Sequence, residues 1–114
     1  MSAAVPLIER HCVEGAAALD AAAIAALLAQ VPGWNVAGNR LERRFAFRDF
    51  HDTMAFVNAL AWIVHRENHH PELQVSYKHC TVAFTTHSAG NALSENDFIC
   101  AARIDALFAG RAGA

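Results

Sequence analysis

The stretch Glu67-Asn68-His69-His70-Pro71-Glu72 marks a change of structure in the middle of this 114-residue chain. Apolar residues recur with helical spacing before it and alternate with polar residues after it. Pro71 disfavours helical geometry at the residue that precedes it. We therefore expect a helix to end near Asn68 and a strand to open with His69 and His70.

Two strands are predicted downstream of this stretch. Residues 73–78 alternate between apolar and polar side chains, and the run from Thr81 to Thr86 is rich in residues that favour strands. In an antiparallel hairpin the start of one strand lies beside the end of the other. His87, expected to close the second strand, would then lie close to His69, although eighteen positions separate them.

The helix upstream of the opening stretch is expected to begin after Asp49, an N-cap residue with Asp52 three positions later. Helical spacing predicts its apolar stripe. The stripe consists of Phe50, Met54, Val57, Leu60, Ala61 and Val64, and is widened by Phe56 and Ile63. With so many apolar side chains, this helix is predicted to be the most buried of the chain.

A second hairpin is predicted further upstream. It consists of a short strand from Trp34 to Val36, the turn Ala37-Gly38-Asn39 and an alternating strand from Leu41 to Arg48. Before it, an alanine-rich helix is expected to begin after Asp20 and to end at Pro32-Gly33.

The run Ser94-Glu95-Asn96-Asp97 has the form of a capping box and opens the last predicted helix. The expected inner face of that helix is Cys100, Ala101, Ile104, Leu107 and Phe108. The order of elements is therefore α-β-β-α-β-β-α. This order predicts an α+β fold in which a four-stranded antiparallel sheet has three helices packed on one face and a polar, open opposite face.

Residues 1–17 show no periodicity and are expected to form a loosely ordered N-terminal lead-in, whereas residues 18–114 are expected to form a single domain.

The composition sets the class of protein. A chain that is 54% hydrophobic and 18% charged is typical of a folded globule. Its formal charge of −2 and its lack of a long apolar run predict neither nucleic acid nor a membrane as a direct partner. No secretory signal is recognisable, so we expect a cytoplasmic protein.

The three cysteines, Cys12, Cys80 and Cys100, are widely spaced and form no CxxC pair. This pattern predicts reduced thiols that pack as small hydrophobic side chains, and it does not indicate a structural zinc site.

Three of the seven histidines form the candidate functional cluster. A helix end stopped by Pro71 is a place where the adjacent His69 and His70 can both face one site, and His87 is expected to arrive across the hairpin. An imidazole has an unperturbed pKa of roughly 6.5, so such a cluster suits proton transfer near neutral pH. The other histidines are interpreted as surface or structural residues.

Two chemistries could use the cluster. Three imidazoles suit a zinc ion, but the HExxH spacing is absent and Glu72 is the only carboxylate near enough in sequence to orient a ligand. Metal-free general acid–base catalysis needs only correctly placed imidazoles. The second chemistry is favoured, and no metal is expected.

A resemblance becomes visible once these residues are set side by side. The ordered set is Gly33-Trp34, Phe45 to Phe50, Asn68 to Glu72, Tyr77, Thr85-Thr86-His87, Leu93-Ser94 and Asp97. This set resembles the pterin-4a-carbinolamine dehydratases over about residues 19 to 109. The sequence departs from the family pattern at Leu73, where a tryptophan is usual, and at His65, where an acidic residue is common.

The resemblance implies a small hydro-lyase that forms homodimers or homotetramers. Such enzymes dehydrate 4a-hydroxytetrahydropterin to quinonoid dihydropterin without metal or cofactor, and so recycle the tetrahydropterin used by aromatic amino acid hydroxylases. By this resemblance His69, His70 and His87 would be the catalytic residues. Asn68, Pro71, Thr85, Thr86 and Ser88 would bind the substrate. Asp97 matches a recurrent aspartate of the family, but helix capping explains it equally well.

A different class of function remains open. Some animal members of this family are dimerisation cofactors of a homeodomain transcription factor, so the chain could be a non-catalytic interaction module of the same fold. The intact histidine trio favours the enzyme, because a scaffold has no need of it.

Overall fold

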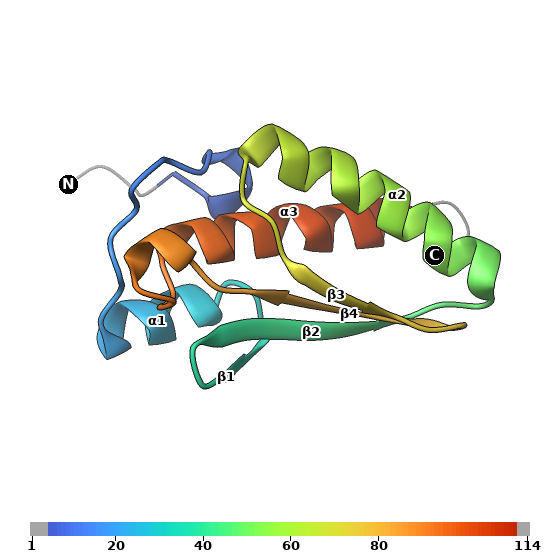
Figure 1. Cartoon of the computed structure of the whole chain (residues 1–114), viewed down its shortest axis with the longest axis horizontal. Coiled ribbons are helices and arrows are strands. Elements are labelled where there is room, and N and C mark those ends of the chain that lie inside the picture. Colours follow the sequence, from blue (N-terminus) through green and yellow to red (C-terminus); the bar gives the residue numbers. More distant parts are fainter. Residues whose placement is uncertain (1–4, 112–114) are drawn as a thin grey trace.

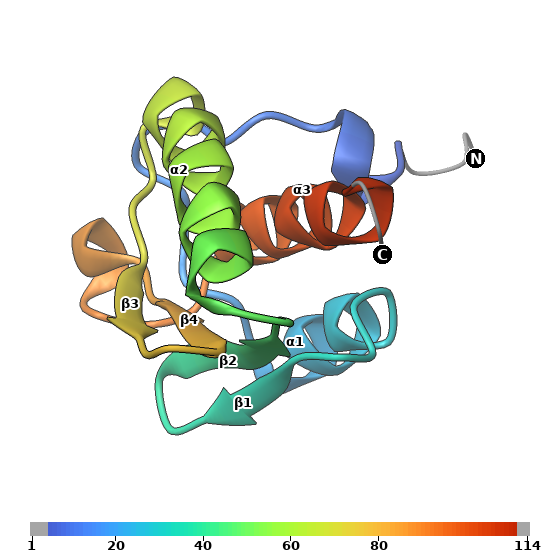
Figure 2. The same ribbon diagram turned by 90° about the vertical axis from the view of Figure 1, so that its right-hand side faces the viewer.

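Residues 5–111 are described by the computed structural model, which combines one sheet with three α-helices (Figure 1). The helices are α1 (Ala21–Leu28), α2 (Phe50–Glu67) and α3 (Glu95–Gly110), and the strands are β1 (Asn35–Ala37), β2 (Arg40–Ala46), β3 (Glu72–Val75) and β4 (His79–Phe84). Two short 3-10 helices, η1 (Leu7–Glu9) and η2 (His87–Ala89), complete the elements. Seen from the side, the α-helices lie on one side of the sheet (Figure 2). The predicted α+β fold is confirmed.

The sheet has the order β1-β2-β4-β3, and every pair of neighbours is antiparallel. Both predicted hairpins are present, and the pairing of β2 with β4 joins them into one sheet. Leu41, Phe45 and Val82 point from the central strands into the core and are fully buried. Glu42 and Arg44 alternate with them and lie on the opposite face. The hydrophobic alternation therefore decides which face of the sheet the helices cover.

Side-chain caps start all three helices where the sequence predicts them. Asp20 Oδ1 accepts a hydrogen bond from the Ala23 amide at 2.8 Å, and Asp49 Oδ1 accepts one from the Asp52 amide at 2.8 Å. Ser94 begins α3 with a complete capping box. Each cap satisfies amide groups that a first helical turn otherwise leaves without a partner.

The expected stripe of α2 is partly wrong. Thr53, Phe56, Leu60 and Val64 are the buried residues of this helix, whereas Phe50 is 48% exposed. The apolar side chains of α2 surround more of its circumference than one neighbour can cover. The helix therefore turns one set of them toward the core and leaves the other at the surface.

The expectation that α2 is the most buried helix is also wrong. Seven residues of α3 are buried, compared with four of α2. α3 contacts α2, α1 and η1. Because neighbours surround α3, its buried set extends to the polar residues Asn96 and Asp97.

The N-terminal segment is not a loose lead-in between residues 7 and 13. Leu7 is only 3% exposed, and the Cys12 amide donates to Glu67 Oε1 at 2.7 Å. Asn96 holds Val13 at both backbone groups, with the Val13 amide 3.0 Å from Asn96 Oδ1 and Asn96 Nδ2 2.8 Å from the Val13 carbonyl. In Figure 1 this segment runs from the C-terminal end of α2 past α3 to α1. Residues 1–4 of the expected lead-in lie outside the described residues.

None of the helices in residues 5–111 combines the length and the apolar character that crossing a membrane requires.

Candidate active site

The C-terminal end of α2 places the first histidine of the site. Asn68 adopts the left-handed conformation (φ 51°), its amide donates to the His65 carbonyl, and the His69 amide donates to the Val64 carbonyl at 3.2 Å. These two hydrogen bonds form a Schellman motif with asparagine in the position that glycine usually takes. The motif, followed by Pro71, ends the helix as predicted and turns the chain at His69.

The side chain of His69 is held by a buried carboxylate. His69 Nε2 lies 2.6 Å from Asp97 Oδ1, and the imidazole stacks on Phe84 at 5.6 Å between ring centroids. His69 is 11% exposed at its side chain and Asp97 is fully buried. The ring therefore contacts a buried carboxyl oxygen on one edge and an aromatic side chain on one face.

The second oxygen of Asp97 also has its partners. Asp97 Oδ2 accepts hydrogen bonds from Thr86 Oγ1 and from the Ser94 amide, both at 2.9 Å. Thr86 Oγ1 and Ser94 Oγ are 2.6 Å apart. The capping role predicted for Asp97 is confirmed, and the structure adds a contact of the same carboxylate with His69.

The other two histidines lie just outside the strands rather than within them. β3 begins at Glu72 and β4 ends at Phe84, so His70 precedes the hairpin and His87 begins η2. Extending the register in which Glu72 faces Ala83 brings the segment of His69 and His70 beside Thr85 and Thr86. The hairpin therefore brings His69 and His70 beside the two residues that precede His87, although neither His70 nor His87 belongs to the ladder.

The two exposed imidazoles are held differently. His87 Nδ1 lies 2.7 Å from Asn91 Oδ1, an interaction within one turn of chain that orients the His87 ring. His70 is exposed, and its imidazole makes no hydrogen bond within residues 5–111. His69 thus contacts a buried carboxylate, His87 contacts an asparagine of its own turn, and His70 has no hydrogen-bond partner within the described residues.

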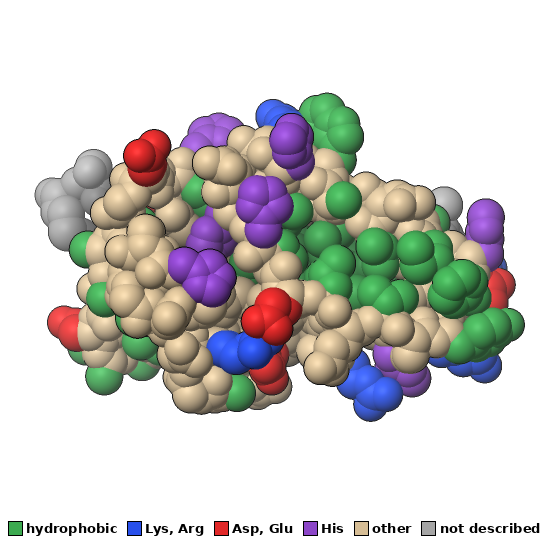
Figure 3. Space-filling view, in the orientation of Figure 1, with side chains coloured by type: hydrophobic (Ala, Val, Ile, Leu, Met, Phe, Trp, Pro, Cys, Tyr) green, Lys and Arg blue, Asp and Glu red, His purple; other side chains and the backbone are tan. Residues whose placement is uncertain are grey.

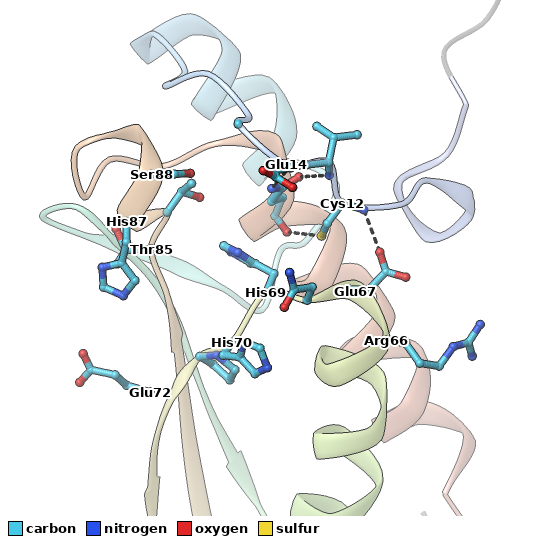
Figure 4. Close-up of a pocket in the computed structure, with 16 residues that line it drawn as sticks. Cys12, Glu14, Arg66, Glu67, His69, His70, Glu72, Thr85, His87 and Ser88 are labelled. Atoms are coloured by element: carbon cyan, nitrogen blue, oxygen red, sulfur yellow. Dashed lines mark hydrogen bonds between the residues drawn. The ribbon is translucent and has the colours of Figure 1, made fainter.

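A cavity of about 650 Å³ lies between these segments (Figure 4). Its volume falls within the range typical of small-molecule sites. All eight predicted site residues line it, namely Asn68, His69, His70, Pro71, Thr85, Thr86, His87 and Ser88. Figure 3 shows histidine side chains gathered on this part of the surface. The structure therefore brings the whole predicted set together at one cavity.

One wall of the cavity was not predicted. Cys12, Val13, Glu14 and Gly15 form it, together with Asn96 from α3. The hydrogen bonds of Val13 to Asn96, across 83 positions of sequence, hold this wall in place. No periodicity or motif in residues 12–15 signals this role, so only the packed structure assigns it.

Glu67 anchors the same wall from α2. Burial raises the pKa of this carboxyl group, but the Cys12 amide, the His11 side chain and the charge of Arg103 outweigh burial, and the pKa is lowered overall. His11 Nδ1 lies 3.0 Å from Glu67 Oε2. The carboxylate is therefore stabilised in its charged form as a structural anchor of residues 11 and 12.

Among residues 5–111, no three histidine, cysteine, aspartate or glutamate side chains stand close enough together to hold a metal ion. Imidazoles line the cavity, one of them in contact with a buried carboxylate, and imidazoles are groups that can transfer protons.

The fold and site define a class of protein, an α+β domain with a histidine-lined cavity at the junction of a helix and a hairpin. The family model described as "Pterin 4 alpha carbinolamine dehydratase" matches residues 17–107. The chain belongs to this family, as the resemblance in its sequence implies.

Relatives match over nearly the whole length of the chain. A "Putative pterin-4-alpha-carbinolamine dehydratase" of Stenotrophomonas maltophilia is 51% identical over 112 residues, covering 94% of this chain and 96% of the relative. A protein of the same name from Dechloromonas aromatica is 47% identical over 110 residues, covering 94% and 97%. A crystal structure from Brucella melitensis, described as "transcriptional coactivator/pterin dehydratase", has a TM-score of 0.74 at 29% identity and covers 79% of this chain and 97% of that chain.

Proposed function

We propose that this protein is a hydro-lyase that dehydrates 4a-hydroxytetrahydropterin to quinonoid dihydropterin by metal-free acid–base catalysis. The observation that carries the proposal is the His69–Asp97 pair, with its 2.6 Å contact, at a cavity shared with His70 and His87. Membership of the family supplies the substrate class.

The reaction removes a hydroxyl group from a tetrahedral ring carbon and a proton from the neighbouring ring nitrogen. An acid has to protonate the departing oxygen, and a base has to accept the proton of the nitrogen. Each correctly placed group contributes a rate factor of about 10²–10⁴. Imidazoles suit both roles, because near neutral pH they can donate as well as accept a proton.

Asp97 decides which nitrogen of His69 carries the proton. Both carboxylate oxygens already accept hydrogen bonds, and an ionised carboxylate has no proton to donate. His69 Nε2 is therefore the donor in this contact, and in the neutral ring the lone pair is on Nδ1. We assign His69 as the base, since Asp97 stabilises the imidazolium that forms when Nδ1 accepts a proton.

His70 is assigned as the acid that protonates the departing hydroxyl. It is exposed at the cavity and makes no hydrogen bond within the described residues, so it can exchange protons with solvent between turnovers. His87, which Asn91 tethers, would orient the substrate.

The expected substrate-binding residues surround this centre. Thr85 Oγ1 is buried without a hydrogen-bond partner in the described chain, which leaves a hydroxyl group beside the cavity for a polar ring edge. Asn68, Pro71, Thr86 and Ser88 complete the set. The pterin is the substrate, and no separate cofactor is required by this chemistry. An aromatic amino acid hydroxylase that forms the hydroxylated pterin is the expected functional partner.

Self-association is proposed as well, as a homodimer or homotetramer. Three exposed apolar side chains lie close together at this end of the sheet: Phe50 of α2, Val75 of β3 and Tyr77 of the turn after β3. The rings of Phe50 and Tyr77 stack with 6.2 Å between their centroids. Hydrophobic side chains cover this part of the surface in Figure 3. β3 is also an edge of the sheet, and such edges pair readily with another strand.

The same surface supports the alternative function, a non-catalytic interaction module. The description of the Brucella melitensis structure as a "transcriptional coactivator/pterin dehydratase" names both activities for that protein. The two functions are separable by experiment, because the cavity and the apolar surface use different residues.

The decisive test is stopped-flow absorbance with freshly generated 4a-hydroxytetrahydropterin. Wild-type protein is expected to accelerate dehydration with and without a chelator, and His70→Ala is expected to lose about 10²–10⁴-fold of the rate. His51→Ala is the matched control, because His51 is exposed on the first turn of α2 and does not line the cavity. No acceleration by the wild-type protein would favour the interaction module, and loss of activity in chelator would favour a metal enzyme.

A further inference from the structure

Two of the three cysteines meet at the unpredicted wall of the cavity. Cys12 Sγ and Cys100 Sγ are 3.5 Å apart, although 88 positions of sequence separate them. Cys12 lies in the extended segment after η1, and Cys100 lies on α3. The third cysteine, Cys80, is buried in β4. The sequence, which shows only widely spaced cysteines, gives no sign of this contact.

The two thiols have different access to solvent. Cys12 is half-buried and lines the cavity, so it is the residue of the pair that a small reagent in the cavity approaches. Its sulfur atom also lies 3.6 Å from the Asn96 carbonyl oxygen. Cys100 is fully buried beneath it. The contact with Cys12 and the burial both raise the pKa of the Cys100 thiol, so this residue stays protonated while the pair is reduced. An oxidant therefore meets Cys12 first.

The geometry allows a bond between the two sulfur atoms. A disulfide has a sulfur–sulfur distance of about 2.05 Å, so the atoms have to approach by roughly 1.5 Å. Residues 10–13 carry no regular secondary structure and are held to the domain by side chains, so a small shift of Cys12 breaks no helix or strand.

We propose that Cys12 and Cys100 are a redox modification site, at which a reversible disulfide fastens the wall formed by residues 12–15 to α3. A small peroxide is the oxidant class, and a low-molecular-weight thiol is the reductant class. The inference concerns the thiols and the wall alone, and it stands apart from the proposed dehydratase activity.

The oxidation proceeds in two balanced steps. The Cys12 thiolate attacks one peroxide oxygen, the O–O bond breaks, and Cys12 becomes a sulfenic acid while the other oxygen leaves as water after protonation. Cys100 sulfur then attacks Cys12 sulfur, the S–O bond breaks, and a second water leaves with the proton of the Cys100 thiol. One peroxide is reduced and two thiols are oxidised. Two equivalents of thiol reductant restore the pair by exchange.

The disulfide would act on the wall of the cavity. In the reduced protein, the hydrogen bonds of Cys12 to Glu67 and of Val13 to Asn96 hold this segment. A covalent link at Cys12 adds a constraint that local opening cannot release. Backbone amides of residues 12–15 should then exchange with solvent more slowly, because exchange requires that opening.

The test is oxidation of the full chain by hydrogen peroxide, followed by thiol titration and peptide mapping. Free thiols are expected to fall from three to one per chain, and dithiothreitol should restore all three. Trypsin leaves Cys12 in residues 11–40 but Cys80 and Cys100 together in residues 79–103. Mapping is therefore repeated in Cys80→Ala, where a link between these peptides can involve only Cys12 and Cys100.

Two physical measurements complete the test. Oxidation should raise the melting temperature by at least about 5 °C, because the link closes a long loop in the unfolded chain. It should also slow hydrogen exchange of residues 12–15 about tenfold. Neither change should occur in Cys100→Ala, and both should persist in Cys80→Ala.

Several results would overturn the inference. Three free thiols after peroxide treatment would show that the pair does not react. A disulfide between chains, or a sulfinic acid at Cys12 with Cys100 still free, would show that Cys100 does not resolve the sulfenic acid. A link that forms with unchanged exchange of residues 12–15 would show that it does not control the wall.

Discussion

Asp97→Asn is the substitution that tests most directly how the site is built. The side chain keeps its shape but exchanges one acceptor oxygen for an amide group that donates. Asp97 accepts three hydrogen bonds, from His69, Thr86 and the Ser94 amide. If the side-chain NH₂ group of the new asparagine faced the backbone N–H of Ser94, two hydrogen-bond donors would meet at the helix cap. We therefore expect it to face His69, where it forces Nε2 to accept and moves the proton to Nδ1.

The magnitude follows from what is lost. Nδ1 of the neutral ring can no longer act as a base, so the catalysed rate should fall by about 10²–10⁴-fold. Replacing a hydrogen bond to a charged acceptor by a neutral one in a fully buried position should lower the free energy of unfolding by about 1–1.5 kcal/mol, the difference between the two kinds of hydrogen bond. The protein should still fold, because the cap of α3 is retained.

The assay pairs stopped-flow dehydration rates with urea unfolding of the same preparation. Asp105→Asn is the matched control, because this carboxylate of α3 accepts hydrogen bonds from Trp34 Nε1 at 2.8 Å and from Arg43 at 2.7 Å away from the cavity. Asp105→Asn also removes a charged hydrogen-bond acceptor of α3, so it should lower stability and leave the rate unchanged.

A folded Asp97→Asn protein with the wild-type rate would refute the assignment of His69 as the base oriented by Asp97. An equal loss of rate in Asp105→Asn would show that the effect arises from stability rather than from the orientation of His69.

Two further predictions concern the junction that places the site. The lowered pKa of Glu67 stabilises the fold above its ordinary pKa of about 4.5, and that contribution disappears as pH falls through the lowered value. Urea unfolding should therefore give Glu67→Gln a lower free energy of unfolding than wild type at pH 7, and this difference should shrink below pH 4.5. A difference in the free energy of unfolding that does not depend on pH would contradict this. At Asn68, where φ is 51°, replacement by alanine should lower the free energy of unfolding by about 1–2 kcal/mol, whereas glycine should be tolerated. Equal stability of the two Asn68 variants, measured by the same unfolding, would argue against a left-handed requirement.

Local chemistry explains why much of the fold was predictable. Asp20, Asp49 and Ser94 cap their helices through amides two or three residues away, so the signal for each start is contained in a few consecutive residues. The alternation in β2 likewise places Leu41 and Phe45 on one face without reference to distant residues. Such signals depend on neighbours in the chain, which the sequence displays directly.

The incorrect expectations concern distant neighbours. Phe50 and Leu60 both fit helical spacing, but only Leu60 is fully buried, because the positions of α3 and the sheet select which side of α2 is covered. Leu7 and Cys12 show no periodicity, and they are placed by contacts with α2 and α3. A pattern along the sequence does not show which side of a helix its distant neighbours cover, or where a segment without periodicity packs.

The threonine and asparagine residues that line the cavity were expected from the resemblance to a known family. The sequence by itself determined the order of elements, the helix caps, the two hairpins and the trio of histidines that lines the cavity. These follow from interactions within a turn, a strand or one hairpin. Only the tertiary structure decided that β2 pairs with β4, that Asp97 holds His69, and that residues 12–15 close the cavity beside Cys100. Each of these depends on groups tens of residues apart, and they meet because burial of the common core brings their elements together.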